Sequence, residues 1–146
     1  MYRQTGAGIE VFLVHPGGPF WAKKDLGAWS IPKGEYTEEE PPRDAALREF
    51  REETGFEVSG QPIALGTIKQ SGGKIVSVWT VEGDCDPARL VSNTCMIEWP
   101  PRSGRKIDIA EVDRGAWFSI EAARERILKG QAPALDLLAR LFLSQP

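Results

Sequence analysis

The sequence contains very little cysteine and histidine. Its 146 residues include two cysteines, Cys85 and Cys95, and a single histidine, His15. Structural zinc sites take four ligands, almost always from these residue types, and the two cysteines are too far apart in the sequence to form a paired-ligand motif. A zinc site is therefore not supported, and we expect both cysteines to be reduced structural thiols.

Long hydrophobic runs and an excess of positive charge are also missing. No stretch approaches the roughly 18 apolar residues of a membrane span, and Met1 to Ala7 lacks the basic-then-apolar layout of a secretory signal. The formal net charge of −3 disfavours a general nucleic-acid binder. We therefore expect a cytoplasmic protein, with no membrane and no nucleic acid among its partners.

The chain does contain enough apolar material to form a core. Hydrophobic residues make up 41% of the sequence and charged residues 27%, which excludes a wholly disordered chain. The length is close to the commonest domain size, and no repeat or low-complexity linker divides the chain. We expect residues 1–146 to form a single domain.

Apolar alternation and turn signals predict an α/β fold. Strands are predicted at 9–15, 62–69, 74–81, 94–99 and 116–119, with a hairpin turn at Ser71-Gly72-Gly73. A first helix is predicted to begin at Pro41 and Pro42, which fit a first turn, and to stop at Gly55. Further helices are predicted from an N-cap at Ser119 towards Lys129, and over 133–143. The stretch 100–107 is predicted as a loop. Hairpins separated by helices favour a mixed β-sheet between helices.

Acidic residues are concentrated in the segment 35–53. It holds eight acids and three bases, a net charge of −5, so the remaining residues carry +2 of the total of −3. Glu49, Glu52 and Glu53 stand at i, i+3 and i+4, which places three carboxylates on one helix face. Such oxygen donors suit a hard cation such as Mg²⁺. On charge alone, the alternative is a solvated acidic face paired with Arg48 and Arg51.

The spacing of this segment forms a complete motif. Gly34 is followed by five residues and Glu40, then by seven residues and the run Arg48-Glu49-Phe50-Arg51-Glu52-Glu53-Thr54-Gly55-Phe56. This run fills every fixed position of G-x5-E-x7-R-E-U-x-E-E-x-G-U, the Nudix box, where U is aliphatic or aromatic. The sequence therefore resembles the Nudix hydrolases. The resemblance implies a Nudix-type α/β/α sandwich and Mg²⁺-dependent cleavage of a diphosphate linkage in a nucleoside diphosphate joined to another group, with Mn²⁺ as a substitute metal.

The resemblance also implies roles for individual residues. The metal ligands would be Glu49, Glu52 and Glu53, and the catalytic group would comprise Glu52, Glu53, Arg48 and Glu111. Arg48 and Glu40 match positions that often pair with each other or with the metal ligands. Gly34 would present its backbone near the metal, and Gly55 would supply the helix exit.

In the family, the general base or an extra metal ligand lies outside the box. Glu111 is our first candidate for the base, because it stands a few residues before the aromatic Trp117 in what resembles the family's late loop. Asp113 and Glu98 are weaker alternatives. The competing interpretation of Glu111 is an ordinary exposed loop residue.

The entry to the box has a second resemblance. Trp29-Ser30-Ile31-Pro32-Lys33-Gly34 is similar to the W-x-x-P-K-G entry of asymmetrical dinucleoside tetraphosphate hydrolases and related bacterial enzymes. It implies that Lys33, with Gly34, contacts the nucleotide's phosphates, and it favours a long phosphate chain. Trp29 is expected to pack under the box, whereas Tyr36 and Trp21 are candidates for base stacking. Candidates for the positive side of the cleft are Lys23, Lys24, Lys69, Lys74, Arg102, Arg105 and Lys106.

The resemblance leaves the substrate and assembly open. We expect a nucleotide-type small molecule as substrate, whereas the oligomeric state is not predicted. The alternative function is a nucleotide-binding regulatory module without turnover; a cap or 5′-triphosphate hydrolase lacks an evident basic stripe. Relatives commonly begin with an additional strand, whereas only Met1 to Gly8 precedes the first predicted strand here. The sequence therefore does not indicate which residues form the N-terminal wall of the cleft.

Overall fold

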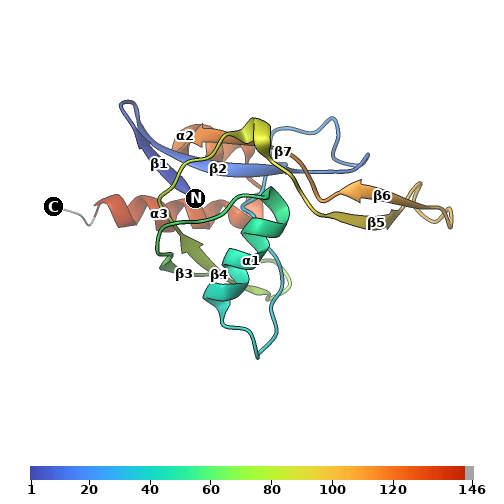
Figure 1. The fold of residues 1–146 in the computed structure, drawn as a ribbon, viewed down its shortest axis with the longest axis horizontal. Helices are drawn as coiled ribbons and strands as arrows, with labels where there is room; N and C mark the ends of the chain where they lie inside the picture. The colour runs from blue at the N-terminus through green and yellow to red at the C-terminus, as the bar shows by residue number, and fades with distance from the viewer. Residues whose placement is uncertain (144–146) are drawn as a thin grey trace.

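The computed structural model describes residues 1–143 and contains strands and helices in alternation (Figure 1). The strands are β1 (Tyr2–Thr5), β2 (Gly8–Pro16), β3 (Ile63–Lys69), β4 (Ile75–Thr80), β5 (Thr94–Glu98), β6 (Lys106–Ala110) and β7 (Val112–Ser119). The helices are α1 (Pro42–Thr54), α2 (Ile120–Arg126) and α3 (Ala132–Leu143), with short 3₁₀ turns η1 (Pro87–Arg89) and η2 (Lys129–Gln131). The hydrogen-bonded sheets are β1-β2-β7, β3-β4 and β5-β6.

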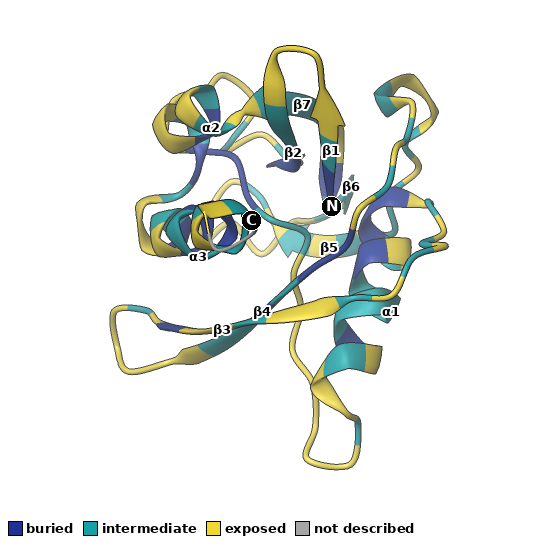
Figure 2. Cartoon of the chain, turned by 90° about the vertical axis from the view of Figure 1, so that its left-hand side faces the viewer, coloured by how far each residue is buried: buried dark blue, intermediate teal, exposed yellow. Residues whose placement is uncertain are grey.

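Strand β2 lies at the centre of the core. Val11 and Leu13 are buried in a cluster with residues of α2 and α3, whereas Phe12 and Val14 are buried on the opposite face with Phe50 of α1. A strand that is apolar on both faces is typical of the middle layer of a fold. The result is an α/β/α arrangement (Figure 2), which confirms the predicted fold class.

The sheets are joined by a short parallel contact at β1. The strand pairs within each sheet are antiparallel. The Tyr2 amide, however, donates to the Val81 carbonyl (3.0 Å), and the Gly83 amide donates to the Tyr2 carbonyl (3.0 Å), beside a parallel bridge from Tyr2 to Glu82. Strand β1, which the sequence did not predict, therefore links β2 to the segment after β4.

The region around 94–119 differs from the prediction. Part of the predicted loop 100–107 belongs to β6, which pairs with β5 along its whole length, and β7 begins at Val112 rather than at residue 116. The alternation of Ile107 and Ile109 was the signal for β6. Strands β5 and β6 with their turn project from the body as the β5–β6 arm (Figure 1), whose tip carries the exposed Arg102 and Arg105.

Helices α1 and α2 begin where the sequence predicts. Pro42 occupies the first turn of α1, and Gly55 ends it with a φ of 76°, a conformation that favours glycine. The Ser119 hydroxyl accepts from the Ala122 amide at the start of α2. Helix α2 ends at Arg126, earlier than predicted, because Ile127 is extended and forms a bridge to Trp29.

Trp29 lies in the core on the side of α2 and α3. Its ring centroid is 5.0 Å from that of Phe118 and 5.2 Å from that of His15, and its indole N–H donates to Asp25 (2.7 Å). The expectation that Trp29 packs under the box was therefore wrong, because the α1 side of β2 is filled by a separate cluster around Phe12.

Two further expectations concern cysteines and membranes. Cys85 and Cys95 are free and partly buried, and burial raises the pKa of the Cys85 thiol to about 11. Among residues 1–143, no helix combines the length and apolar character needed to cross a membrane.

Candidate functional site

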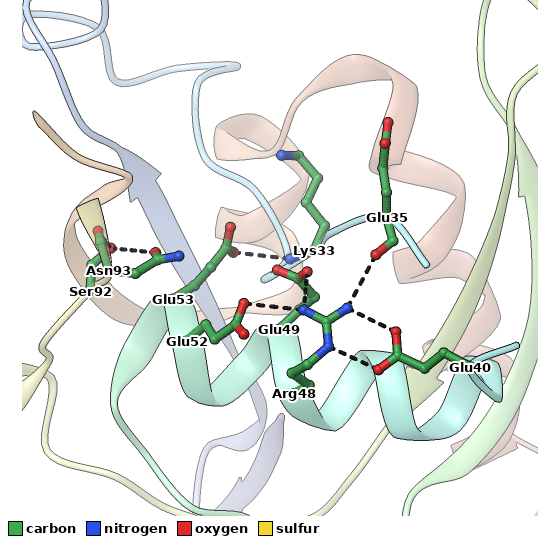
Figure 3. Close-up of polar contacts among 9 residues, drawn as sticks. All are labelled: Lys33, Glu35, Glu40, Arg48, Glu49, Glu52, Glu53, Ser92 and Asn93. Atoms are coloured by element: carbon green, nitrogen blue, oxygen red, sulfur yellow. Dashed lines mark hydrogen bonds and ion pairs between the residues drawn. The ribbon is translucent and has the colours of Figure 1, made fainter. Parts of the chain in front are cut away.

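Three carboxylates of the motif lie on the last two turns of α1 (Figure 3). Glu53 faces inward and is only 6% exposed, whereas the side chain of Glu52 is 39% exposed. The side chain of Glu49 lies between these extremes, with 14% exposure. The three carboxylates therefore range from a buried side chain at Glu53 to a solvated one at Glu52.

Arg48 holds the outer carboxylates together. Its guanidinium makes two hydrogen bonds of 2.9 Å to the carboxylate of Glu40, and Nη1 donates to Glu49 (2.8 Å) and Glu52 (3.2 Å). Nη2 also donates to the Glu35 carbonyl (3.2 Å), so all five N–H donors of an arginine are occupied. The pairing lowers the pKa of Glu40 and raises that of Arg48. Arg48 thus pairs with both Glu40 and the carboxylates.

Glu53 is held from the other side by the entry loop. The Lys33 amide donates to Glu53 Oε1 (3.0 Å). Burial raises the pKa of Glu53 to about 7, the Lys33 contact opposes this shift, and the negative charges of Glu111 and Glu49 add to it. The Lys33 side chain is exposed and forms no ion pair within the described residues (Figure 3). The Lys33 ammonium group of the entry loop therefore lies near Glu53, a carboxyl group whose ionised form is disfavoured by burial.

Gly34 allows the entry loop to pass close to the helix. A Cβ atom at this position would lie 1.8 Å from the carboxylate carbon of Glu49, so any side chain would displace that group. A Cβ at Gly55 would likewise lie 2.9 Å from the Val91 carbonyl oxygen. Both glycines of the motif are therefore required by close approach of another segment.

A loop before β5 closes the end of α1 and connects it to Glu111. The Asn93 amide donates to the Glu52 carbonyl (2.8 Å), and the Val91 amide donates to the Thr54 carbonyl (3.0 Å). The Glu111 amide in turn donates to the Asn93 carbonyl (3.0 Å). Asn93, which lies beside Glu53 in Figure 3, was not among the predicted site residues. No local motif surrounds it, so only the tertiary fold shows its position.

The structure brings Glu111 towards the carboxylates but not the alternative bases. The charge of Glu111 acts on Glu53, and its side chain has no hydrogen bond or ion pair within residues 1–143. The carboxylate of Asp113 instead contacts His15 Nδ1 (2.9 Å). Glu98 stands at the outer end of β5, where it accepts from the Arg102 amide (2.6 Å).

The three carboxylates are of the type that binds magnesium, although each of them contacts a neighbouring protein group instead. Within the described residues, no three histidine, cysteine or acidic side chains are assembled as a ready metal site. Glu49 and Glu52 accept from Arg48, and Glu53 accepts from the Lys33 amide. Carboxylates are the ligands that Mg²⁺ prefers, and the absence of a side chain at Gly34 leaves room for the Glu49 carboxylate beside the entry loop.

A large cavity begins at the same entry loop. It has a volume of about 660 Å³, and its lining includes Lys33, Gly34 and Glu49. Its walls come from the first turns of α1 and from β4, and Tyr36 also lines it. The second stacking candidate, Trp21, packs instead beside the core cluster of α2 and α3.

Comparison with known proteins identifies the family. A model of the NUDIX domain matches residues 1–141. The chain therefore belongs to the NUDIX domain family, and the prediction of a Nudix hydrolase is confirmed at the level of the family.

Solved structures show the same fold. A Caenorhabditis elegans Ap4A hydrolase, determined as a binary complex, is 19% identical, with a TM-score of 0.66 over 99% of this chain and 95% of that one. The NUDIX domain of Shewanella oneidensis NrtR, complexed with ADP ribose, is 20% identical, with a TM-score of 0.62 over 98% of this chain and 83% of that one. At these identities the likeness concerns the fold alone.

A curated relative shares a short segment. The m7GpppN-mRNA hydrolase dcap-2 of Caenorhabditis elegans is 62% identical over 29 residues, which are 20% of this chain. The match spans 4% of the length of that protein.

Proposed function

We propose that this protein hydrolyses a diphosphate linkage in a nucleoside diphosphate joined to another group, with Mg²⁺ as cofactor and Mn²⁺ as a substitute. The observation that carries the proposal is the buried Glu53 carboxyl beside Glu49, Glu52 and Glu111. Burial raises its pKa to about 7, and a bound cation would favour its ionised form. Family membership supports the same chemistry.

The metal would be held by Glu49, Glu52 and Glu53. When bound, Mg²⁺ neutralises charge on phosphate oxygens and makes a coordinated water more acidic. To hold the cation, the carboxylates of Glu49 and Glu52 would exchange their contacts to Arg48 for the metal, whereas Arg48 would keep its paired contact to Glu40. Because Nε and Nη2 would remain bound to Glu40 and to the Glu35 carbonyl, we assign Arg48 a positioning role rather than a contact with substrate.

Glu111 is our proposed general base. Its side chain has no partner within the described residues, and its backbone is fixed at both sides, since its amide donates to Asn93 and its carbonyl accepts from the Gly17 amide (2.9 Å). A base must lie within reach of the attacking water but need not contact the ground-state substrate tightly. Glu111 would remove the proton from that water while the box carboxylates bind the cation.

We propose that the preferred substrate has a long phosphate chain, as in a dinucleoside tetraphosphate or a nucleoside triphosphate. Lys33 offers an exposed ammonium group beside the carboxylates and can contact a phosphate beyond the scissile link. Lys33→Ala should therefore raise the KM of a long-chain substrate more than that of ADP-ribose. An equal or better kcat/KM for ADP-ribose in the unmodified enzyme would contradict this preference.

The remaining assignments follow from composition. We propose a nucleotide-type small molecule as partner, rather than a nucleic acid, because the net charge is −3. The cytoplasmic location stays a prediction.

The decisive experiment is a substrate screen with both products identified. Purified protein would be incubated with Mg²⁺ and dinucleoside polyphosphates, normal and oxidised nucleoside triphosphates, ADP-ribose and diphosphoinositol phosphates. Hydrolysis of a phosphoanhydride bond that requires the metal supports the proposal. Binding of a nucleotide without turnover of any compound would instead favour a regulatory module.

A further inference from the structure

The segment before β5 joins the two sides of the site through its main chain. The Asn93 amide donates to the Glu52 carbonyl (2.8 Å), and the Asn93 carbonyl accepts from the Glu111 amide (3.0 Å). The Ser92 hydroxyl accepts from the Val112 amide (3.0 Å) and donates to the Asn93 carbonyl (2.7 Å). Because these bonds use only backbone atoms of Asn93, a substitution of its side chain should leave the segment in place.

The side chain of Asn93 lies between the carboxylates of the two sides. The β5–β6 ladder pairs Thr94 with Ala110, so the hydrogen bond between Asn93 and Glu111 continues the ladder by one pair. The side chains of such opposed residues lie on the same face of a ladder, close to each other. On the other side, the Asn93 amide group points towards Glu53 of α1 (Figure 3). Asn93 therefore stands where α1 and the base of the β5–β6 arm face each other.

The side-chain nitrogen of Asn93 is a hydrogen-bond donor without a partner. The Oδ1 atom lies 3.4 Å from the Ser92 hydroxyl, which places the oxygen towards Ser92 and the nitrogen towards Glu53 (Figure 3). Neither N–H group of this nitrogen makes a hydrogen bond within residues 1–143, and the residue is half-buried. Ionised carboxylates can only accept hydrogen bonds. An anionic phosphate beside Glu53 and Glu111 therefore needs donors from other groups, and Asn93 has two of them free.

From these contacts, and resting on the proposed function, we infer that the Asn93 side chain donates a hydrogen bond to an oxygen of the phosphate that is attacked. It does so from the side of Glu111, whereas the proposed metal ligands Glu49, Glu52 and Glu53 lie on α1. A neutral donor whose backbone is already fixed stabilises charge that develops on this oxygen with little reorganisation. Asn93 is thus a further catalytic residue, and Lys33 is left to contact phosphates beyond the scissile link.

The test compares two variants that remove different parts of the side chain. Asn93→Asp keeps the shape and one oxygen but removes both donors and adds a negative charge, whereas Asn93→Ala removes the whole group. Binding of methylenediphosphonate, a pyrophosphate analogue that is not hydrolysed, would be measured by calorimetry with Mg²⁺. Turnover would be measured with the best substrate of the screen. We expect binding to weaken at least about tenfold in Asn93→Asp and about fivefold in Asn93→Ala, and kcat to fall about 100-fold in both.

The matched control is Thr94→Ala, a change at the next residue, which is exposed and has no side-chain hydrogen bond within the described part of the chain. It should bind the analogue and turn over substrate like the unmodified protein. Thermal unfolding shows which variants are folded, and Asn93→Ala carries the test if Asn93→Asp does not fold.

The inference is overturned if the analogue does not bind to the unmodified protein, or if either folded Asn93 variant keeps normal binding or normal turnover. A failure of the proposed function is a different result. In that case the analogue binds and both Asn93 variants weaken it, but the unmodified protein hydrolyses no compound of the screen.

Discussion

The two sides of the site are built by different kinds of contact. On the α1 side, side chains hold one another, since Arg48 joins Glu40, Glu49 and Glu52. On the opposite side, Glu111 is held only through its backbone, by hydrogen bonds to Asn93 and Gly17. A change on α1 should therefore disturb several groups at once, whereas a change at Glu111 should remove one function and leave the rest.

The largest effect is expected from loss of one of the carboxylates in the last turn of α1. Glu53→Gln and Glu52→Gln should each lower kcat/KM by about 1,000-fold, roughly 4 kcal/mol, because each removes a metal ligand. The folded state should persist, and Glu53→Gln should stabilise the metal-free protein at neutral pH by removing an unfavourable buried charge. Enzyme assays and thermal unfolding check both points.

The matched control for these variants is Glu39→Gln, a change at an exposed residue of the same acidic segment. It should leave activity near that of the unmodified protein. Near-normal turnover by folded Glu52→Gln or Glu53→Gln protein would refute the metal-ligand assignment.

Glu111→Gln tests the side of the site opposite α1. We expect kcat to fall by roughly 100-fold with little change in substrate affinity, as for loss of a base that acts on the attacking water. Single-turnover kinetics and equilibrium binding separate the two quantities. If Asp113→Asn or Glu98→Gln lowers kcat while Glu111→Gln does not, the base has been assigned to the wrong residue.

Gly34→Ala tests the side-chain arrangement on α1 without altering a charge. Its Cβ would displace the carboxylate of Glu49, so we expect about a tenfold loss of kcat/KM and weaker binding of Mg²⁺. Gly6→Ala is the control, because a Cβ at Gly6 meets nothing within 4 Å. Equal activity in the two variants would show that Glu49 tolerates displacement.

The smallest effect concerns pH and the metal-free protein. In the folded state the pKa of Glu53 is raised from 4.5 to about 7, so the folded protein keeps a proton that the unfolded chain loses between these values. The contribution of the Glu53 carboxyl to the free energy of unfolding is therefore largest below about pH 4.5 and is lost as the pH rises through about 7. Tm should fall by several degrees between about pH 5 and pH 8, and Mg²⁺ should restore it. Glu53→Gln should abolish this fall of Tm with pH. If Tm falls with pH equally in the variant, other groups cause the dependence.

Local chemistry made much of this architecture predictable. Pro42 and Gly55 mark the ends of α1, and the spacing of Glu49, Glu52 and Glu53 follows from helix geometry. The β3–β4 hairpin was predicted from its glycine turn and β-branched residues, and the structure confirms it.

The rest depends on contacts between distant segments. Asn93 meets the end of α1 only because the chain folds back there, and β1 is defined by its pairing with β2. The cavity lined by α1 and β4 depends on how the helix and the strand are placed in the fold, which no local pattern in the sequence indicates. The roles of Glu52, Glu53 and Glu111 stay predictions.

The β5–β6 arm is the part of the molecule that can open by itself. Its strands bond only to each other, and none of its residues belongs to a buried core cluster, whereas β2 is bonded on both edges and buried on both faces. A two-stranded sheet is marginally stable alone, so the arm can unzip while the body stays folded. Asn93 and Glu111 stand at its base, where the ladder ends. Opening of the arm would therefore remove backbone support from Glu111 before it disturbed the carboxylates on α1.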